Sequence, residues 1–600
     1  MTTNYDLQSN SALGNRITTW DDGCAAVVAT WDHSNLSNFP DRGAGYNFYD
    51  GTTFGEEPEV RQEPMKSGWP SIAACGQGEI LASHATGTNV YYRPTKGYGE
   101  WTLVHNFPDA TWPRVVVSGP NNEFVHIVAA YQESDGAGGY INHIYYARST
   151  DYGQTWSDMV EFPGIDNSAD GDYRNQLSAD DYVMAANGNN VAVMFSSYTT
   201  EVFYMISHDN GETWERQIIA PYPILGADGN PVHAIAFEDY PEGMTDTIST
   251  SDNSHSIVID DHGVVHAAFG LFRWKVADAE HYTYWPAWGF GIVYWNSNYT
   301  NEQGGHEIPL FGNFSGDADH PEWTADGLGY SYFNTRMIEL VNNYPGQPNL
   351  YICGLIDEDG DGYYGSYENS TGASWHYRSL GVATMPAISI DNYGNMVIIY
   401  SVWSEVRING NTGFSYRSAY ITARDQAGTW FDDCINLSSD FIHEYDEAYP
   451  TFAAQKGYDG SFWVGYSADD MQGLYLDISD TYPNSNGGAL TENYIYLVKV
   501  TPDMPGWENV TEQAVNPMTA TRVYPNPATD VLNIEVNASQ SSEMSISVYN
   551  IMGQLVMSKN VNLTTGINRP TISTAELNSG IYFVTVKANG FENTMKFIVK

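Results

Sequence analysis

Short apolar runs separated by turns rich in Gly, Asp and Asn follow one another along most of the 600 residues. Residues 256–269 and 387–400 show the layout well: an apolar strand, a polar turn and a second apolar strand. No long stretch has the 3.6-residue periodicity of an amphipathic helix. The pattern therefore predicts an all-β chain of short strands joined by tight turns.

The strand pattern recurs, and each recurrence can supply four strands. The repeating units lie near residues 14–64, 68–108, 111–163, 172–222, 252–311, 331–381, 384–438 and 447–512. A β-propeller with about eight four-stranded blades accounts for them, and seven blades result if the first and last units share one blade. Radial repetition also protects sheet edges, which a long open sheet would expose.

Residues 149–156 and 207–214 are near copies of each other and both read S-x-D-x-G-x-T-W. Partial copies occur near residues 50–54, 99–101, 372–375 and 428–430. The motif resembles the Asp-box (BNR repeat) of sialidase-like propellers, where it forms the turn between the third and fourth strands of a blade. Asp accepts amide hydrogen bonds in such a turn and Gly takes a positive φ, so the motif indicates a fold and not catalysis.

The composition changes near residue 515. Residues 520–600 carry six basic and five acidic side chains, whereas the chain as a whole has a formal charge of −48. We therefore expect an N-terminal extension at 1–13, the propeller at 14–514 and a C-terminal domain at 515–600. Period-2 alternation in the last domain predicts a small immunoglobulin-like β-sandwich.

Four motifs mark this last domain: Val523–Ala528, Val548–Gln554, Leu577–Tyr582 and Lys596–Lys600. In this order they resemble the type A sorting domain of type IX secretion in Bacteroidetes. The resemblance implies handling by the type IX secretion machinery through residues 520–600 and a secreted or outer-membrane cell-surface location. In that family the domain is usually removed after export.

The strongly acidic charge argues against binding to nucleic acid or to an anionic membrane surface. No run of 18 apolar residues is present, so we expect no membrane span. The four cysteines, Cys24, Cys75, Cys353 and Cys434, allow three full disulfide pairings. The sequence does not choose among these pairings or exclude free thiols.

Aligning the first strand of each unit places four arginines at one equivalent position: Arg16, Arg114, Arg174 and Arg336. First strands line the central channel of a propeller, so we expect these guanidiniums to surround the channel mouth. Guanidinium groups bind carboxylates in a bidentate manner. The pattern therefore predicts an anion site for an acidic sugar, unless each arginine pairs with a carboxylate of a neighbouring blade.

The connections between the second and third strands are long near residues 132–140, 271–290, 404–413 and 470–491. The second of these contains Trp274, Trp285 and Trp288, whose flat rings suit the C–H faces of sugars. These tryptophans are a further predicted ligand site. The alternative is a loop that packs on itself.

Residues 357–362 read D-x-D-x-D-G, and Glu368 lies at the twelfth position of an EF-hand-type loop. We predict a calcium site formed by Asp357, Asp359, Asp361 and the Tyr363 carbonyl. Glu368 fits less well, because five residues of extended strand would carry it roughly 16 Å away from the turn. The alternative is an acidic hairpin without a metal ion.

These features favour a secreted or cell-surface propeller that binds an acidic glycan or glycoprotein. A sialidase-like glycoside hydrolase and a protein-binding adhesin are the alternatives. The sialidase resemblance is incomplete, because Arg16-Ile17-Thr18 stands where that family has Arg-Ile-Pro. The sequence identifies no catalytic residues.

Overall fold

The computed structural model describes residues 1–308, 352–353, 356, 381–502 and 518–600, apart from gaps inside these ranges. The gaps are residues 10, 35, 135–139, 166–172, 174–175, 226–228, 236–247, 279–280, 286–290, 301–303, 382, 409–414, 431–433, 440–446, 470–491, 539–540, 552 and 589–590. The described residues form strands, turns and coil, which confirms the all-β class. The chain divides into two compact units, and the second contains Val510–Lys600.

The described part of the first unit forms seven antiparallel sheets in chain order, numbered here from first to seventh. The first sheet contains β2 (Ile17–Thr19), β3 (Ala25–Trp31) and β4 (Gly43–Tyr49). The second sheet contains β5 (Gly68–Cys75), β6 (Gly78–Ala85), β7 (Gly87–Arg93) and β8 (Thr102–Phe107). The third sheet contains β9 (Ala110–Ser118), β10 (Phe124–Ser134), β11 (Tyr140–Ser149) and β12 (Val160–Glu161). The fourth sheet contains β13 (Tyr182–Asn187), β14 (Asn190–Phe195), β15 (Val202–Ser207) and β16 (Glu215–Ala220). The fifth sheet contains β17 (Ile248–Ile259), β18 (Val265–Asp278), β19 (His281–Trp285), β20 (Gly291–Asn296) and β21 (Ile352–Cys353). The sixth sheet contains β22 (Ala383–Ile390), β23 (Met396–Ile408), β24 (Ser415–Arg424) and β25 (Ile435–Asn436). The seventh sheet contains β26 (Glu447–Ala453), β27 (Phe462–Asp469), β28 (Asn493–Val500) and β1 (Thr2–Thr3).

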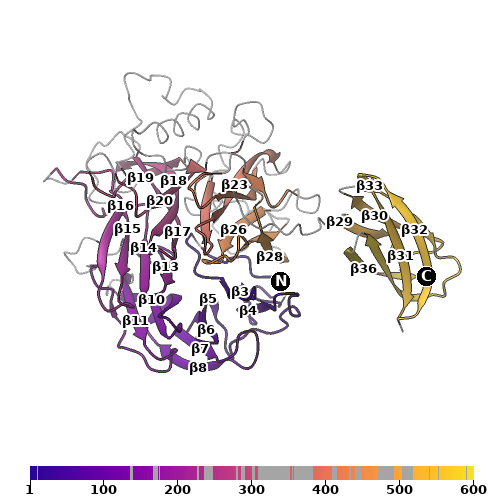
Figure 1. Ribbon diagram of the computed structural model, residues 1–600, viewed down its shortest axis with the longest axis horizontal. Coiled ribbons are helices and arrows are strands. Elements are labelled where there is room, and N and C mark those ends of the chain that lie inside the picture. The colour runs from indigo at the N-terminus through magenta and orange to yellow at the C-terminus, as the bar shows by residue number, and fades with distance from the viewer. Residues whose placement is uncertain are drawn as a thin grey trace, which may run out of the picture. The chain divides into compact units, whose positions relative to one another are not determined.

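The seven sheets form a closed ring. The first strands of neighbouring sheets contact one another in turn, from β5 and β9 through β13, β17 and β22 to β26. The ring closes where Ile17 and Val27 of the first sheet share a core with Phe452 and Trp463 of the seventh. Figure 1 shows β13 and β5 near the middle of the ring and β16 and β8 at its periphery. This radial arrangement is that of a β-propeller.

The number of sheets differs from the eight units expected from the sequence. Most of the expected unit at 331–381 lies outside the described residues. Its described strand, β21, pairs with β20 at the outer edge of the fifth sheet and so completes that sheet. The first and seventh sheets also share a connection, because β1 pairs with β28. Residues 1–13 are therefore part of the ring and not an extension before it.

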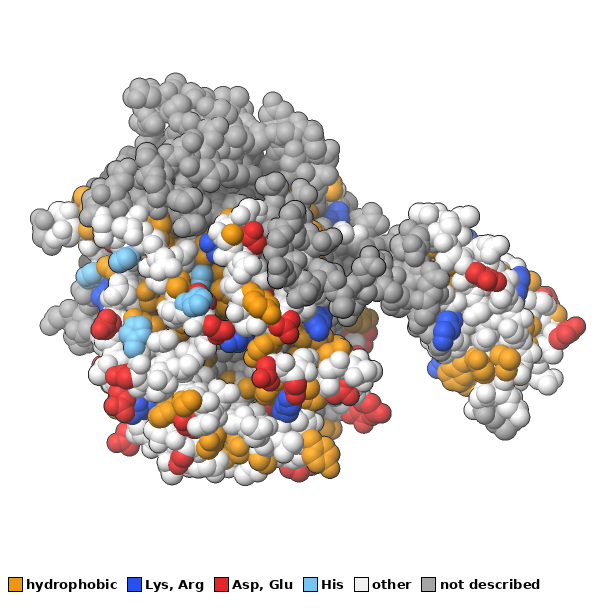
Figure 2. Space-filling model, in the orientation of Figure 1, with side chains coloured by type: hydrophobic (Ala, Val, Ile, Leu, Met, Phe, Trp, Pro, Cys, Tyr) orange, Lys and Arg blue, Asp and Glu red, His pale blue; other side chains and the backbone are white. Residues whose placement is uncertain are grey.

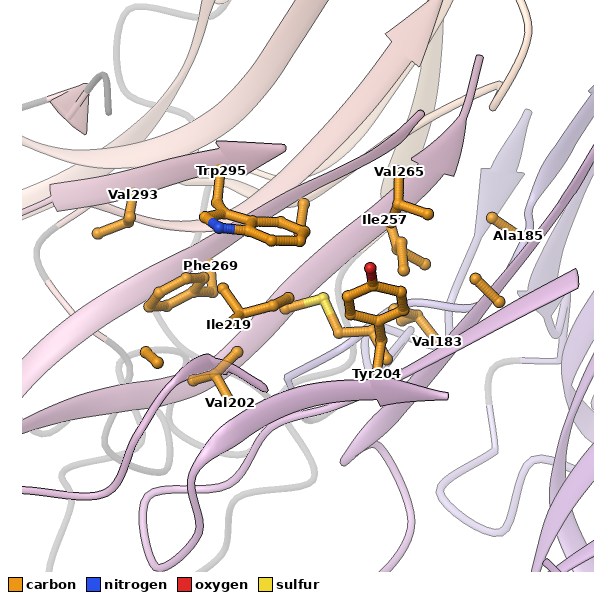
Figure 3. Close-up of a cluster of buried hydrophobic side chains, with 14 of the residues drawn as sticks. Val183, Ala185, Val202, Tyr204, Ile219, Ile257, Val265, Phe269, Val293 and Trp295 are labelled. Atoms are coloured by element: carbon orange, nitrogen blue, oxygen red, sulfur yellow. The ribbon is translucent and has the colours of Figure 1, made fainter. Parts of the chain in front are cut away.

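Adjacent sheets are held together by apolar side chains that meet face to face. Between the fourth and fifth sheets, Tyr204 and Ile219 meet Ile257, Phe269 and Trp295 in one buried cluster (Figure 3). Each sheet in the ring presents both faces to neighbours, so its strands are apolar on both sides. This explains why β13, β14 and β15 read as nearly continuous apolar runs.

The two S-x-D-x-G-x-T-W segments form the same hydrogen-bonded turn between the third and fourth strands. In the first, the Asp151 carboxylate accepts hydrogen bonds from the Thr155 amide at 2.8 Å and the Thr155 hydroxyl at 2.6 Å. The Trp156 ring packs against Phe107 of the preceding sheet, with centroids 5.4 Å apart. The motif therefore links neighbouring sheets, as its residue types predict.

The second unit is a sandwich of two antiparallel sheets around one core. One sheet contains β29 (Met518–Tyr524), β30 (Val531–Ala538), β33 (Gly566–Asn568) and β34 (Thr571–Ser573). The other has the order β32 (Leu555–Leu563), β31 (Ser542–Asn550), β35 (Gly580–Ala588) and β36 (Phe591–Val599).

Candidate functional site on the loop face

The predicted Arg16 and Arg114 lie close together in the ring, and both are buried. The pKa of Arg16 is lowered to about 9, chiefly by burial and further by the nearby charge of Arg114. The Arg16 guanidinium donates hydrogen bonds to the carbonyl oxygens of Gln8 at 2.7 Å and Pro70 at 2.5 Å. Its contacts are therefore with the chain itself.

Arg114 is engaged in the same way. It donates to the carbonyl oxygen of Ala12 at 2.9 Å and to the Asp180 carboxylate at 2.6 Å. A buried guanidinium with a carboxylate partner is already neutralised, so we do not place the ligand site at Arg16 and Arg114.

Arg174 and Arg336 lie outside the described residues. The first strand of the fourth sheet begins at Tyr182, eight residues after Arg174.

The residues that precede β2 fill the middle of the ring. Ala12 belongs to the core between the fourth and fifth sheets, and the Ser11 hydroxyl donates to the Asp180 carbonyl at 3.3 Å. Asn15 accepts a hydrogen bond from the Ile72 amide at 2.9 Å. A cavity of about 30 Å³ remains beside this segment. Ligand pockets measure roughly 300–1,000 Å³, so this cavity is too small for a sugar.

Alternating strand directions define two faces of the ring. One face, here called the loop face, carries the connections between second and third strands and those that enter each first strand. Three of the four predicted long connections join the second and third strands of their sheets. The strand pairs extend far toward these connections, up to Ser134 opposite Tyr140 in the third sheet and Ile408 opposite Ser415 in the sixth. The fourth, at 470–491, lies outside the described residues.

The aromatic connection at 271–290 is partly described. Its backbone forms a hairpin of β18 and β19 in which Trp274 lies opposite Tyr284, and Arg273 lies opposite Trp285. Trp288 lies outside the described residues. So do the predicted calcium ligands Asp357, Asp359, Asp361, Tyr363 and Glu368, and no metal-binding group of three side chains occurs among the described residues.

A row of aromatic rings lies on the loop face beside the middle of the ring. Trp69 at the start of β5, His84 near the end of β6 and Trp112 at the start of β9 are partly exposed. The ring centroids are 5.5 Å apart for Trp69 and His84 and 5.0 Å apart for His84 and Trp112. We call these three residues the aromatic row.

Arg42 lies at one end of the aromatic row. Its Cζ atom is 4.9 Å from the Trp69 ring centroid and 5.3 Å from that of Tyr5. Its Nε donates to the Ser67 carbonyl at 2.8 Å, and one terminal nitrogen donates to the Tyr5 hydroxyl at 3.3 Å. Arg42 makes no ion pair with any carboxylate of the described residues. In a chain with a formal charge of −48, an arginine without an acidic partner is notable.

The charge of Arg42 acts on two neighbouring groups. The pKa of His84 is lowered to about 4, mainly by burial and also by the charge of Arg42. The pKa of the exposed Lys66 amine is lowered, first by desolvation and then by Arg42. Acidic side chains are spread over the face of the first unit seen in Figure 2. An anion that reaches Arg42 thus meets two cationic groups within a generally acidic surface.

Sequence reasoning missed the aromatic row, although the chain carries a signal for it. In four units, a proline lies directly before the aligned first-strand position. With the residue before it, the pairs are Trp69-Pro70, Trp112-Pro113, Met385-Pro386 and Tyr449-Pro450. Trp69 and Trp112 have φ values of 48° and 49°, so the strand bends there. Tryptophan at two equivalent bends in consecutive sheets would have indicated neighbouring rings.

Comparison with known proteins bears on the second unit. Residues 522–600 match the family model described as the secretion system C-terminal sorting domain. These residues are a sorting domain. The protein is therefore secreted or attached at the outer-membrane cell surface, as the sequence motifs predict. Among the described residues, no helix has the length and apolar character needed to cross a membrane.

No curated protein matches the chain. Among solved structures, polysaccharide lyase Uly1 is 9% identical with a TM-score of 0.37, covering 82% of this chain and 90% of that one. A protein of unknown function from Dyadobacter fermentans is 10% identical with a TM-score of 0.34, covering 82% and 96%. The GH93 α-L-arabinofuranosidase of Fusarium graminearum is 13% identical with a TM-score of 0.28, covering 47% and 83%. We base no argument on these low similarities.

Proposed function

We propose that this exported protein is a seven-bladed propeller that binds an acidic glycan, free or on a glycoprotein, on its loop face. The aromatic row with Arg42 at its end is the observation that carries the proposal. This position replaces the predicted arginine site, because the chain's own residues occupy the guanidiniums of Arg16 and Arg114.

The aromatic row offers the apolar part of such a site. Trp69 and His84 come from the first two strands of the second sheet, and Trp112 comes from the first strand of the third sheet, so the ring scaffold fixes their spacing. Indole rings bind the C–H faces of sugars by burying apolar area. Because the rings are already fixed in the protein, binding does not lose side-chain conformational entropy. Neighbouring rings 5–6 Å apart suit a ligand that covers more than one ring.

Arg42 offers the charged part. Its Nε is fixed by the Ser67 carbonyl, and its position over the rings of Tyr5 and Trp69 restrains the guanidinium plane. A restrained guanidinium that lacks a carboxylate partner can bind a ligand carboxylate through charge-assisted hydrogen bonds. An acidic sugar, such as a sialic or uronic acid, combines the two chemical features that the site provides.

The test is binding of the full chain to an array of neutral and acidic glycans, followed by titration of the best ligand. Trp112→Ala should weaken binding about five- to 150-fold, since loss of one stacked ring costs roughly 1–3 kcal/mol. Tyr98→Ala is the matched control, because Tyr98 is 80% exposed between β7 and β8 on the opposite face. Equal binding by wild type and Trp112→Ala would refute the site.

A fluorogenic sialoside or uronide, incubated with the same preparations, separates binding from catalysis. Release of the fluorophore by wild type would favour the hydrolase over the binding protein. Binding only to protein ligands without glycans would favour the adhesin.

A further inference from the structure

The sorting domain exposes an apolar surface on one of its sheets. In the sheet β32-β31-β35-β36, alternate residues point into the core, as the buried Val548, Val584 and Val586 do. The residues between them point outward, because successive side chains of a strand lie on opposite faces. The outward face is therefore defined by the register of the four strands.

Five outward residues at one end of this sheet are apolar and adjacent. The register pairs Tyr549 with both Leu555 and Phe583, and it pairs Ile581 with Ile598. The exposed fractions of the four aliphatic and phenyl side chains, Leu555, Phe583, Ile581 and Ile598, lie between 36% and 56%. We call these five residues the sorting-domain patch.

The sorting-domain patch is unusual for a small soluble domain. Single exposed apolar residues are common, but a contiguous group that spans four strands marks an interaction surface. The core of the domain does not need these residues, because it is already closed by the inward ones. We therefore infer that these apolar side chains stabilise contact with another molecule.

Lysines border the sorting-domain patch. Lys596 lies opposite Phe583 in the register. Lys600 follows β36, and both lysines are exposed. A second copy of the domain would bring lysines against lysines, which disfavours self-association. A partner with an apolar centre and acidic side chains around it complements this surface.

We propose that the sorting-domain patch is the surface that a component of the secretion apparatus binds, through an apolar contact bordered by acidic side chains. Residues 522–600 match a sorting domain, so recognition by that apparatus is the task of this unit. The proposal is independent of glycan binding, because it concerns a different unit of the chain.

The experiment measures export of the full chain in a bacterium that has the pathway. The ratio of exported to cell-retained protein is compared for wild type, the double variant Phe583→Ser/Ile581→Thr and the control Val531→Thr. Val531 is 44% exposed on the other sheet of the sandwich. We expect the double variant to lower the ratio more than tenfold, since interface aromatics dominate binding, and the control to match wild type.

Lys596→Glu tests the same surface without a change in apolar area. It should also lower export, because it brings like charges against the acidic border. Urea unfolding of each purified variant shows whether the sandwich is intact. Normal export of both Lys596→Glu and a folded double variant would overturn the proposal. So would light scattering that shows a dimer in wild type and a monomer in the double variant.

Discussion

Replacement of Arg114 by alanine distinguishes a structural role from ligand binding. The Arg114 side chain is 4% exposed and lies 2.6 Å from the Asp180 carboxylate, which is itself 1% exposed. The substitution leaves a buried carboxylate without a partner and removes a donor from the Ala12 carbonyl. Breaking a buried ion pair on one side typically costs about 3–5 kcal/mol. The free energy of unfolding of the ring should fall by that amount.

The assay is equilibrium unfolding in urea followed by tryptophan fluorescence. All 17 tryptophans precede residue 515, so the signal reports the ring and not the sorting domain. Lys456→Ala is the control, because its ion pair with Asp261, also at 2.6 Å, is partly exposed. Pairs of that kind contribute no more than about 1 kcal/mol.

The opposite result has a clear meaning. If Arg114 were a free cation held beside Arg16 for an external anion, its removal would relieve repulsion between like charges. The ring would then be as stable as wild type, or more stable. A loss below about 1 kcal/mol would thus refute the interpretation that Arg114 holds the N-terminal segment in the ring.

Three further outcomes are expected. Gly211→Ala should destabilise the ring by about 1–3 kcal/mol, since Gly211 has a φ of 81° and a Cβ there would lie 2.0 Å from the Tyr146 hydroxyl. The pKa of Asp209 is lowered, mainly by the hydrogen bond from the Thr213 hydroxyl, so its stabilising effect is present above about pH 4 and is lost as the pH falls further. Acid unfolding of Asp209→Asn should accordingly show a weaker dependence on pH. Calcium at millimolar concentration should raise the melting temperature relative to EDTA if residues 357–368 bind the ion.

Each of these outcomes has its own comparison. Gly263→Ala shares a positive φ of 80° but has its nearest neighbour at 3.4 Å, so it should cost less than Gly211→Ala. Identical acid profiles for wild type and Asp209→Asn would contradict the assigned role of the carboxylate. A melting temperature that ignores calcium would count against the predicted site, and Asp359→Asn should remove any calcium effect.

The strands and the motif turns could be predicted because their information is local. Alternation and turn residues set the hairpin at 256–269, which the structure forms as β17 and β18. The Asp151 turn closes through contacts within five residues. The sorting domain was also predictable, because its motifs are specific and follow one another in order.

The contents of the channel could not be predicted in this way. Ala12, Arg114 and Asp180 meet through contacts that join distant parts of the chain. An arginine at a repeated position has the same sequence pattern whether it faces a ligand or a carbonyl of its own chain. The number of sheets, which β21 lowers by joining the fifth, likewise depends on pairing across a long connection.

The pairing of β1 with β28 has a consequence for folding. Met1 and Ile495, which are hydrogen-bonded, are separated by 494 positions. Such a high contact order delays closure, since most of the chain must be made before the first strand finds its partner. Until then the edge of β28 remains unpaired and can recruit another chain. A chaperone that shields this edge during synthesis would therefore increase the yield of closed, export-ready protein.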